Sequence, residues 1–243
     1  KTLPQLQPLE LTVQGDFVWS YGGLEPKIPI PTLLTEIAKE YDYVGSTGDR
    51  RVKTDLLSML LNMHDYNHQN GTHRDLFRIQ AVEFQRFIDT GHHSEAFYEM
   101  PTVPYSLSEK LRQPNLFLLP EILKAHLENC FPSLVVFHGE LPLGKIAQCH
   151  LFIPESEAET RTYVLMFVQA KHPLLLKVLG KTVLQFAEVV VDQDADILGK
   201  LYADTPKNIK LNNEVGMDWV RRNFASFPDV VEPSLSRSQG VGR

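Results

Sequence analysis

The sequence predicts an α+β domain in which a sheet wraps around a helix. Residues 133–141, 144–153 and 160–170 are apolar, strand-like segments with turn residues between them, which is typical of an antiparallel meander. Apolar side chains at helical spacing predict one helix over residues 52–69, before this sheet, and a long helix over 180–203, after it. The order of strands, helix, sheet and long helix is typical of an α+β domain.

The N-terminal part of the chain contributes two further features. Residues 9–21 predict two strands around a Gly15–Asp16 turn. The proline-rich residues 25–34 predict an extended segment on the surface, because proline fixes the backbone and removes a hydrogen-bond donor.

The other segments have weaker patterns. Residues 76–88 predict a strand, and residues 119–130 a short helix or a loop. Residues 215–225 predict a short third helix. The polar, glycine-containing residues 234–243 predict a frayed tail.

The composition excludes several classes of protein. A chain of 243 residues with 43% hydrophobic content can form one large domain over residues 1–243, and no internal boundary is evident. The net charge of −6 argues against nucleic acid as the main partner. No apolar run reaches the roughly 18 residues of a membrane span, and two cysteines do not imply a disulfide framework. We therefore expect a reducing, cytoplasmic setting.

The segment LLNMHDYNHQNGTH contains the most specific pattern, in which Asn62, Asp65, His68 and His73 are spaced as Asn-x-x-Asp-x-x-His-x4-His. Residues three apart share a helix face, so the first three would form a polar ridge. His68 and His73 are five apart, and they can face one metal only if the helix breaks between them. The helix-breaking residues 70–71 supply that break. Asp65 is placed to accept a hydrogen bond from the far nitrogen of His68.

Other interpretations of the histidines remain open. A pair of histidines at a helix end is by itself weak evidence for a metal, and the nearby Asn and Asp could be solvated. We interpret His64 as a surface residue, and His92 and His93 as unable to share a metal because adjacent side chains point apart.

A third ligand is predicted on the long helix. Apolar residues recur along one side of this helix at alternating steps of four and three, at Val183, Ala187, Val190, Ile197 and Leu201. Asp194 occupies the one position of this series that is not apolar. Asp192 and Asp196 lie on other faces. A lone carboxylate that faces the core is costly unless it is paired or bound to a metal. The alternative is a strand that ends in a solvated acidic turn.

With these residues the chain resembles the catalytic domain of Rieske-type non-haem iron oxygenases, the ring-hydroxylating oxygenase alpha subunits. The match comprises Asn62, Asp65, His68 and His73, together with Asp194 before Ile197-Leu198. Weaker support comes from DFVWSYGG near the start and DWVRRNF near the end.

The resemblance implies a helix-grip fold (START-like or Bet v 1-like), with the antiparallel sheet around a long C-terminal helix. It implies a mononuclear Fe(II) held by His68, His73 and Asp194, with positions for O₂ beside a substrate pocket. It gives Asp65 the role of linking the iron to an electron-donating cluster on a neighbouring subunit of a homo-trimer. Asn62 would support Asp65 or line the pocket.

The sequence departs from the family in lacking its [2Fe–2S] module. Cys130 and Cys149 follow the iron ligands and are not part of Cys-x-His or Cys-x-x-His, and Cys149 is better interpreted as a core strand residue. The expected electron donor is therefore a Rieske protein or ferredoxin on another chain or in a missing segment, supplied by an NAD(P)H-dependent reductase; otherwise electron transfer has been lost. We interpret residues 1–21 as strands that follow a missing module, 22–230 as the iron domain and 231–243 as a flexible tail.

The expected function is hydroxylation or oxidative demethylation of an aromatic or lipophilic organic substrate with O₂. The main alternative is a non-catalytic subunit that binds a lipophilic ligand, or a scaffold, on the same fold. A zinc hydrolase using the same ligands is a third hypothesis.

Overall fold

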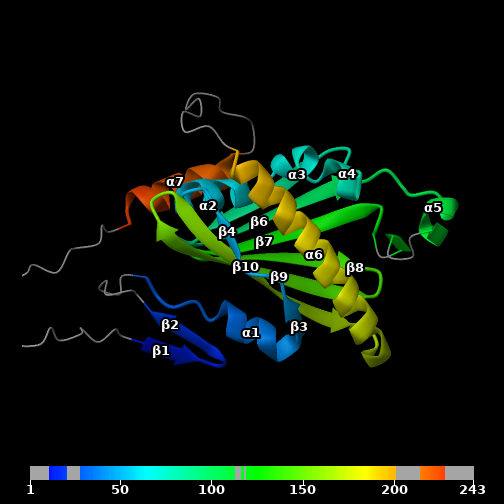
Figure 1. Cartoon of the computed structure of the whole chain (residues 1–243), viewed down its shortest axis with the longest axis horizontal. Coiled ribbons are helices and arrows are strands. Elements are labelled where there is room, and N and C mark those ends of the chain that lie inside the picture. The colour runs from blue at the N-terminus through cyan, green and yellow to red at the C-terminus, as the bar shows by residue number, and fades with distance from the viewer. Residues whose placement is uncertain (1–10, 21–27, 113–115, 118, 201–213, 228–243) are drawn as a thin grey trace, which may run out of the picture.

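The computed structural model describes residues 11–20, 28–112, 116–117, 119–200 and 214–227 (Figure 1). Within these residues the molecule is built on an eight-stranded antiparallel sheet in the order β3-β10-β9-β8-β7-β6-β5, with β4 pairing β10 on the same edge as β3. The strands are β3 (Asp42–Ser46), β4 (Arg50–Val52), β5 (Glu83–Asp89), β6 (His93–Pro101), β7 (Ile122–Cys130), β8 (Leu134–Leu141), β9 (Gly144–Ser156) and β10 (Glu159–Ala170).

One face of the sheet is covered by the long helix α6 (Leu176–Leu198), which runs diagonally across the strands in Figure 1. The short 3-10 helix η2 (Pro173–Leu175) leads into it. The side of α6 that carries Leu179, Val183 and Ala187 packs on Val164 and Met166 of β10. Alternate residues of β10 point to this face because side chains on a strand alternate. The domain is therefore α+β with a helix-grip arrangement, as the sequence predicted.

A group of shorter helices lies along one edge of the sheet. They are α2 (Leu56–His64), α3 (His68–Gly71), α4 (Arg74–Phe77) and α7 (Val215–Ala225), which are neighbours at the top of Figure 1. Trp219 of α7 is almost fully buried in the core cluster that also contains Met59 and Leu60 of α2. Helix α7 thus closes the core beside the segment that carries the two histidines of the predicted site.

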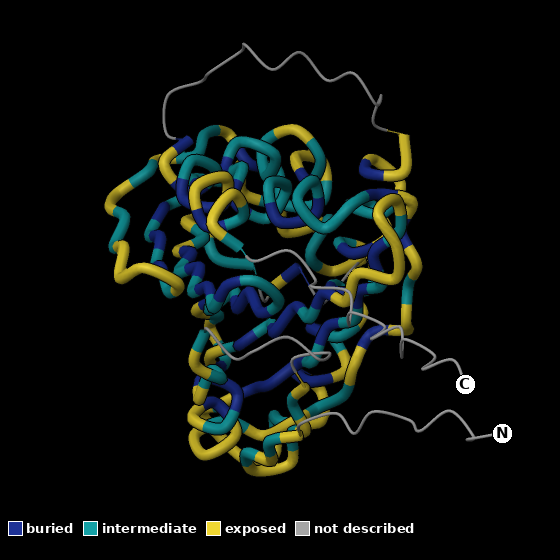
Figure 2. Tube along the Cα trace, turned by 90° about the vertical axis from the view of Figure 1, so that its left-hand side faces the viewer, coloured by how far each residue is buried: buried dark blue, intermediate teal, exposed yellow. Residues whose placement is uncertain are grey.

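The other face of the sheet is only partly covered. Helix α1 (Leu33–Glu40) packs Leu34 and Ile37 against Leu134 and Val136 of β8, and the hairpin β1 (Leu11–Gln14) with β2 (Phe17–Ser20) lies next to it in Figure 1. Helix α5 (Leu107–Arg112) follows β6. In Figure 2 the buried trace runs through the middle of the molecule, and the exposed trace lies at the ends.

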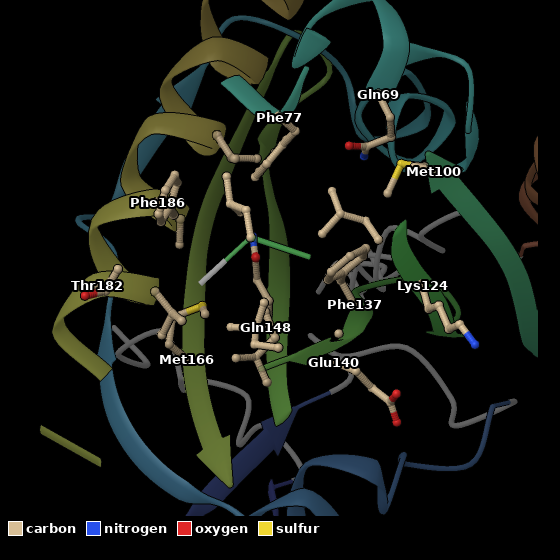
Figure 3. A pocket seen from close by; sticks show the side chains of 18 residues that line it. Gln69, Phe77, Met100, Lys124, Phe137, Glu140, Gln148, Met166, Thr182 and Phe186 are labelled. Carbon is tan, nitrogen blue, oxygen red and sulfur yellow. The ribbon is translucent and has the colours of Figure 1, made fainter. Parts of the chain in front are cut away.

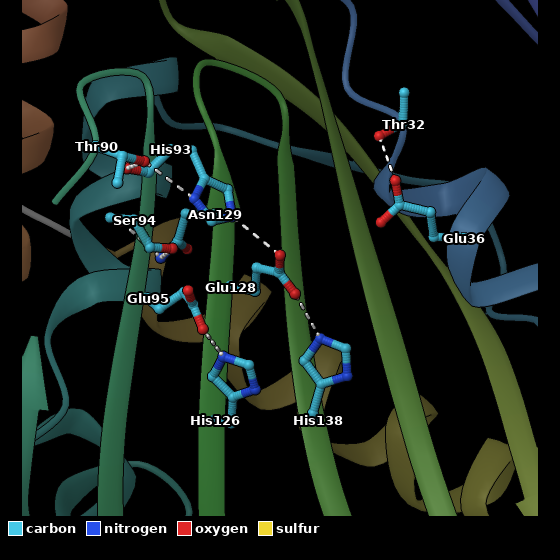
Figure 4. Close-up of polar contacts among 10 residues, drawn as sticks. All are labelled: Thr32, Glu36, Thr90, His93, Ser94, Glu95, His126, Glu128, Asn129 and His138. Carbon is cyan, nitrogen blue, oxygen red and sulfur yellow. Dashed lines mark hydrogen bonds and ion pairs between the residues drawn. The ribbon is translucent and has the colours of Figure 1, made fainter. Parts of the chain in front are cut away.

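The uncovered part of that face carries a ladder of histidines and glutamates (Figure 4). Glu128 of β7 accepts hydrogen bonds from His93 of β6, at 2.9 Å, and from His138 of β8, at 3.1 Å. Glu95 accepts one from His126 at 2.8 Å. Hydrogen-bonded side-chain pairs on neighbouring strands stabilise their pairing.

Several predicted elements are confirmed. The three strand-like segments of the meander are β8, β9 and β10, and residues 9–21 contain the hairpin β1–β2. Residues 215–225 form α7, and Cys149 is a buried residue of β9. The predicted tail at 234–243 lies outside the described residues.

Other predictions were wrong for identifiable reasons. Residues 119–130 contain strand β7, whose buried residues Ala125, Leu127 and Asn129 alternate with polar ones, so the apolar signal was weak. Residues 76–88 hold the end of α4 and most of β5 rather than one strand. The proline-rich segment ends in α1, because Leu33, Leu34 and Ile37 share a buried face. In the described part of the chain, none of the helices is long and apolar enough to cross a membrane.

The close approach of α6 to the sheet gives a stability prediction. A Cβ at Gly180 would lie 2.9 Å from the Cβ of Val44 on β3, so Gly180→Ala overpacks this contact. Overpacking costs about 1–3 kcal/mol, and better helix propensity returns up to about 1 kcal/mol. We expect thermal denaturation to show a Tm lower by about 2–4 °C. The control is Gly71→Ala, where a Cβ would meet nothing within 4 Å; an equal Tm change in both variants would contradict the close-packing explanation.

Candidate metal centre

The chain between α2 and α3 is bent by a buried tyrosine. Helix α2 ends at His64 and Asp65 is its C-cap. Tyr66 then enters the core, where its ring stacks on Phe84 and Tyr98 with centroids 5.8 and 5.1 Å away. The prediction of a continuous helix to residue 69 with a break at 70–71 was therefore wrong, since the helix already ends before His68.

The structure brings His68, His73 and Asp194 together. Asp194 Oδ1 lies 3.2 Å from His73 Nε2 and 3.8 Å from His68 Nε2, and one ligand atom from each residue lies within 4.8 Å of the other two. The side chain of His73 is 0% exposed, that of His68 is 8% exposed and that of Asp194 is 13% exposed. Among the described residues, this is the one group of His, Cys, Asp and Glu side chains with such spacing.

Each histidine is anchored through its opposite ring nitrogen. His68 Nδ1 donates to the backbone oxygen of Asp65 at 2.5 Å, and His73 Nδ1 donates to Gln193 Oε1 at 2.8 Å. A neutral imidazole that donates from Nδ1 keeps an acceptor lone pair on Nε2. Both Nε2 atoms therefore face Asp194 as acceptors, although that of His68 also accepts a hydrogen bond from the Gln69 side chain at 3.1 Å. Anchoring through the opposite ring nitrogen is how ligating histidines are held in metal sites.

The electrostatics of the group favour a charged carboxylate. Burial alone would raise the pKa of Asp194, but the proximity of His73 Nε2, at 3.2 Å, the positive charge that either histidine carries when protonated and the Asn62 amide lower it below its usual value. Burial lowers the pKa of His68. Burial also opposes charge on His73, but Asp194 and Gln193 outweigh it, so the pKa of His73 is raised.

These residues fit a divalent transition metal. His73 Nε2 is buried and makes no hydrogen bond of acceptable geometry, although Asp194 Oδ1 is near. Two imidazole nitrogens and one carboxylate oxygen form the donor set of mononuclear non-haem Fe(II) sites. A cation placed between them would satisfy the orphaned nitrogen and the buried carboxylate together.

Asn62 and Asp65 have contacts that differ from those expected. Asn62 Nδ2 donates to Asp194 Oδ1 at 3.3 Å instead of supporting Asp65. The carboxylate of Asp65 accepts from Asn67 N at 3.0 Å, so Asp65 orients His68 through its backbone oxygen and not through its side chain. Both residues therefore lie beside the His–His–Asp group but make other contacts.

Histidines outside the group have structural partners. His64, predicted at the surface, is fully buried, donates from Nδ1 to Leu60 O at 2.7 Å and stacks on Trp219. Burial lowers its pKa to about 4. His92 contacts Asn223 and His93 contacts Glu128, so these adjacent residues point to different partners.

Sequence reasoning missed two residues of the site. Gln193 is adjacent to Asp194, and the helical pattern gives no signal for its contact with His73. His150 on β9 is buried, and burial lowers its pKa to about 4. It lines a small cavity of about 20 Å³ together with Asn62 and Asp194. Its position on the inward face of β9 follows only once the strand register is known.

A larger cavity of about 90 Å³ lies between α6 and the sheet (Figure 3). Its walls are mainly phenylalanine, methionine and aliphatic side chains, among them Phe77, Phe137 and Phe186. Gln69 and Gln148 also line it, and their amides hydrogen-bond His68 and His150. The cavity therefore adjoins the His–His–Asp group through Gln69, and it adjoins His150 through Gln148.

Comparisons with known proteins support the fold. No protein-family model matches the sequence, and no curated protein matches it. The fold is similar to that of dicamba monooxygenase bound to 3,6-dichlorosalicylic acid, with 14% sequence identity and a TM-score of 0.69 over 89% of this chain and 68% of that chain. It is also similar to Pseudomonas putida CBB5 NdmA with caffeine (11% identity, TM-score 0.59, 88% of this chain and 60% of that one) and to NdmB from the same organism (11%, 0.54, 88% and 59%). At these identities the likeness shows the shared fold, and the chain spans only part of each of these proteins.

Metal binding by the three residues can be measured directly. We expect about one Fe(II) per chain after anaerobic reconstitution, and substitution of His68, His73 or Asp194 by Ala should reduce the metal affinity at least about tenfold. The matched controls are His172→Ala and Asp192→Ala, which remove an exposed histidine and a carboxylate on another face of α6. Metal analysis that shows equal iron in all five variants would rule out this site.

The protonation state of His73 gives a pH dependence. Because Asp194 raises the pKa of His73 above the ordinary histidine value of 6.5, a metal must displace a proton from this ring as the pH falls through that raised pKa. We expect metal affinity to decrease below it and proton release to accompany binding near pH 6.5. Calorimetry in buffers of different ionisation enthalpy measures the protons released; binding without proton release at that pH would contradict this assignment.

Proposed function

We propose that the chain, as a single domain over residues 1–243, is the mononuclear-iron catalytic domain of an oxygenase that acts on an aromatic or lipophilic organic substrate. One observation carries the proposal: two histidines with anchored Nδ1 atoms and a buried carboxylate converge beside an apolar cavity. That arrangement occurs on a fold shared with a monooxygenase. Hydroxylation and oxidative demethylation are the reactions proposed.

In this proposal His68, His73 and Asp194 would hold Fe(II). The iron, when bound with open positions, supplies the redox chemistry with O₂. The protein contributes orientation, since Asp65 and Gln193 fix the two rings and Asn62 holds the Asp194 oxygen. The apolar walls of the cavity exclude water from the substrate.

Electrons would come from outside the chain. Neither Cys130 nor Cys149 belongs to a Cys-x-His motif, and burial raises the pKa of both thiols, that of Cys130 to about 12. We propose a Rieske or ferredoxin [2Fe–2S] donor fed by an NAD(P)H-dependent reductase, docked in a homo-trimer near Asp65. The backbone oxygen of Asp65 is bonded to the ring of His68, which offers a short connection from such a donor to the iron.

A non-catalytic protein that binds a lipophilic ligand is the second candidate, and the apolar cavity alone supports it equally. It differs in needing no metal. A zinc hydrolase would bind a metal, but that metal would not react with O₂ or nitric oxide.

Nitric oxide provides a test that needs no substrate. We expect the Fe(II)-loaded protein to give the EPR signal of a high-spin ferrous nitrosyl, because the three proposed ligands leave open positions on the iron. His73→Ala should lose the signal and His172→Ala should keep it. Iron that binds without any nitrosyl signal would contradict an oxygenase, and absence of iron would favour the ligand-binding protein.

The role of Asp65 can be separated from metal binding. Asp65→Asn keeps the backbone oxygen that hydrogen-bonds His68, so we expect iron content to be retained. The variant removes the carboxylate charge at the proposed docking position of the donor, so multi-turnover O₂ consumption should slow by about tenfold or more, the usual effect of such supporting residues. Asp75→Asn, an exposed carboxylate on α4, is the control. If Asp65→Asn turned over at the rate of the unmodified protein with the same reduced [2Fe–2S] donor, the coupling role would be wrong.

A further inference from the structure

We infer that the cavity between α6 and the sheet selects a neutral aromatic ligand that carries a hydrogen-bond donor, and that Gln69 and Gln148 recognise that donor. This inference rests on the proposed function, because it names the substrate class of the same site. It draws on the charge, size and hydrogen-bonding groups of the cavity wall.

Among the described residues that line the cavity, none places an ionised side chain in its interior. Its two ionisable lining residues are Lys124 and Glu140, and both are exposed. The side chain of Lys124 is 64% exposed and pairs with Glu99 at 3.8 Å. In Figure 3 the side chains of Lys124 and Glu140 are directed away from the centre of the cavity. The remaining polar hydroxyl, on Thr182, donates to the backbone oxygen of Val178 at 2.9 Å.

A charged ligand would therefore lose its hydration without gaining an oppositely charged partner on the wall. Removing an ion from water costs several kcal/mol unless an opposite charge or several hydrogen bonds replace the water. Uncharged aromatic rings lose little hydration free energy and gain contact with the apolar wall. This wall includes Phe77, Phe137, Phe186, Met100 and Met166. This asymmetry favours neutral ligands over both carboxylates and ammonium or amidinium ions.

Gln69 is oriented so that it offers an acceptor. His68 donates from Nδ1 to the Asp65 oxygen, so its Nε2 carries a lone pair. The side-chain nitrogen of Gln69, 3.1 Å away, must therefore donate to it. This arrangement fixes the amide, and within the described part of the chain no hydrogen bond reaches Gln69 Oε1.

Gln148 repeats the arrangement from the sheet side. Its side-chain nitrogen lies 2.9 Å from Nε2 of His150, a neutral ring because it is buried. Among the described residues, its Oε1 also receives no hydrogen bond. Two carbonyl oxygens thus have no hydrogen-bond partner among the described residues on an otherwise apolar wall, and a ligand with N–H or O–H groups would replace the water that reaches them.

The size of the cavity limits the ligand. One water needs about 10–15 Å³ on this scale, so about 90 Å³ is room for about six to nine non-hydrogen atoms. That is comparable to one aromatic ring, with substituents extending to the open side.

Three planar probes of nearly equal shape test the charge preference. Benzamide is neutral, benzoate is an anion and benzamidine is a cation at neutral pH. We expect ligand-detected NMR titration to show benzamide binding at least about tenfold more tightly than either ion, since a fully desolvated charge would cost more than this. Benzoate or benzamidine binding as tightly as benzamide would overturn the inference, and so would the absence of binding by all three.

Two substitutions test the role of the glutamines. Gln69→Leu and Gln148→Leu should each weaken benzamide about three- to tenfold, the value of one hydrogen bond, while binding of toluene stays unchanged or improves. Toluene binding shows that the cavity is still folded. Gln85→Leu, which removes an exposed glutamine on β5, is the control and should change neither. Parallel loss of benzamide and toluene affinity would point to a structural role instead.

The experiment separates this inference from the proposed function. Each titration is carried out with the chelated protein and with protein loaded with Fe(II) under anaerobic conditions without a reductant. Selective benzamide binding without any iron uptake would uphold the ligand class and reject the oxygenase. Iron uptake with equal affinity for the three probes would reject the ligand class and leave the proposed oxygenase standing.

Discussion

The constraint on which the site depends is the burial of one carboxylate on the apolar side of a long helix. Asp194 follows Val190 and Val191 on α6 and has a side chain that is only 13% exposed. A buried carboxylate is strongly unfavourable without charged or hydrogen-bonding partners. Its partners, His68, His73 and Asn62, all come from the segment at the end of α2 and just after it. The carboxylate therefore determines where that segment must lie against α6.

The position of this segment is fixed from its other side by the C-terminal helix. A Cβ at Gly216 of α7 would lie 2.2 Å from the hydroxyl oxygen of Tyr66, so α7 approaches the bend only because this residue is glycine. His64, immediately before the bend, stacks on Trp219 of the same helix. Trp219 in turn donates to Gly91 O at 2.8 Å, which ties α7 to the turn between β5 and β6. Residues more than 140 positions apart thus hold the loop that carries the two histidines.

Sequence patterns were sufficient where one local periodicity decides the structure. The meander β8–β10 has long apolar strands, and Asp194 was singled out because it interrupts an otherwise apolar stripe. Patterns failed where tertiary contacts decide. The bend after α2 depends on Tyr66 inserting between Phe84 and Tyr98, which no local signal announces. Strand β7 is hidden because Lys124, His126 and Glu128 occupy its outer face.

The same limit applies to residues that assist the site. Spacing placed Asp65 near His68, but the atom in contact is the backbone oxygen, which any residue possesses. Gln193 and His150 reach the site from α6 and β9, and their contribution depends on the packing of the helix on the sheet. Sequence reasoning therefore finds the residues whose type is diagnostic and misses those whose position alone gives them a role.

Gln69 links the metal-ligand group to the apolar cavity through one lone pair. The Nε2 atom of His68 accepts the hydrogen bond from Gln69, and it is also the atom that faces Asp194. An imidazole nitrogen has a single lone pair, so a metal at this atom and the Gln69 amide exclude each other. Occupation of the site therefore frees a polar group on the wall of the cavity, where the low dielectric makes an unpaired donor costly. A ligand that offers an acceptor for this freed N–H as well as a donor for the carbonyl oxygen of Gln69, as an amide does, compensates for that cost, so the metal and such a ligand are expected to favour each other's binding through this one side chain.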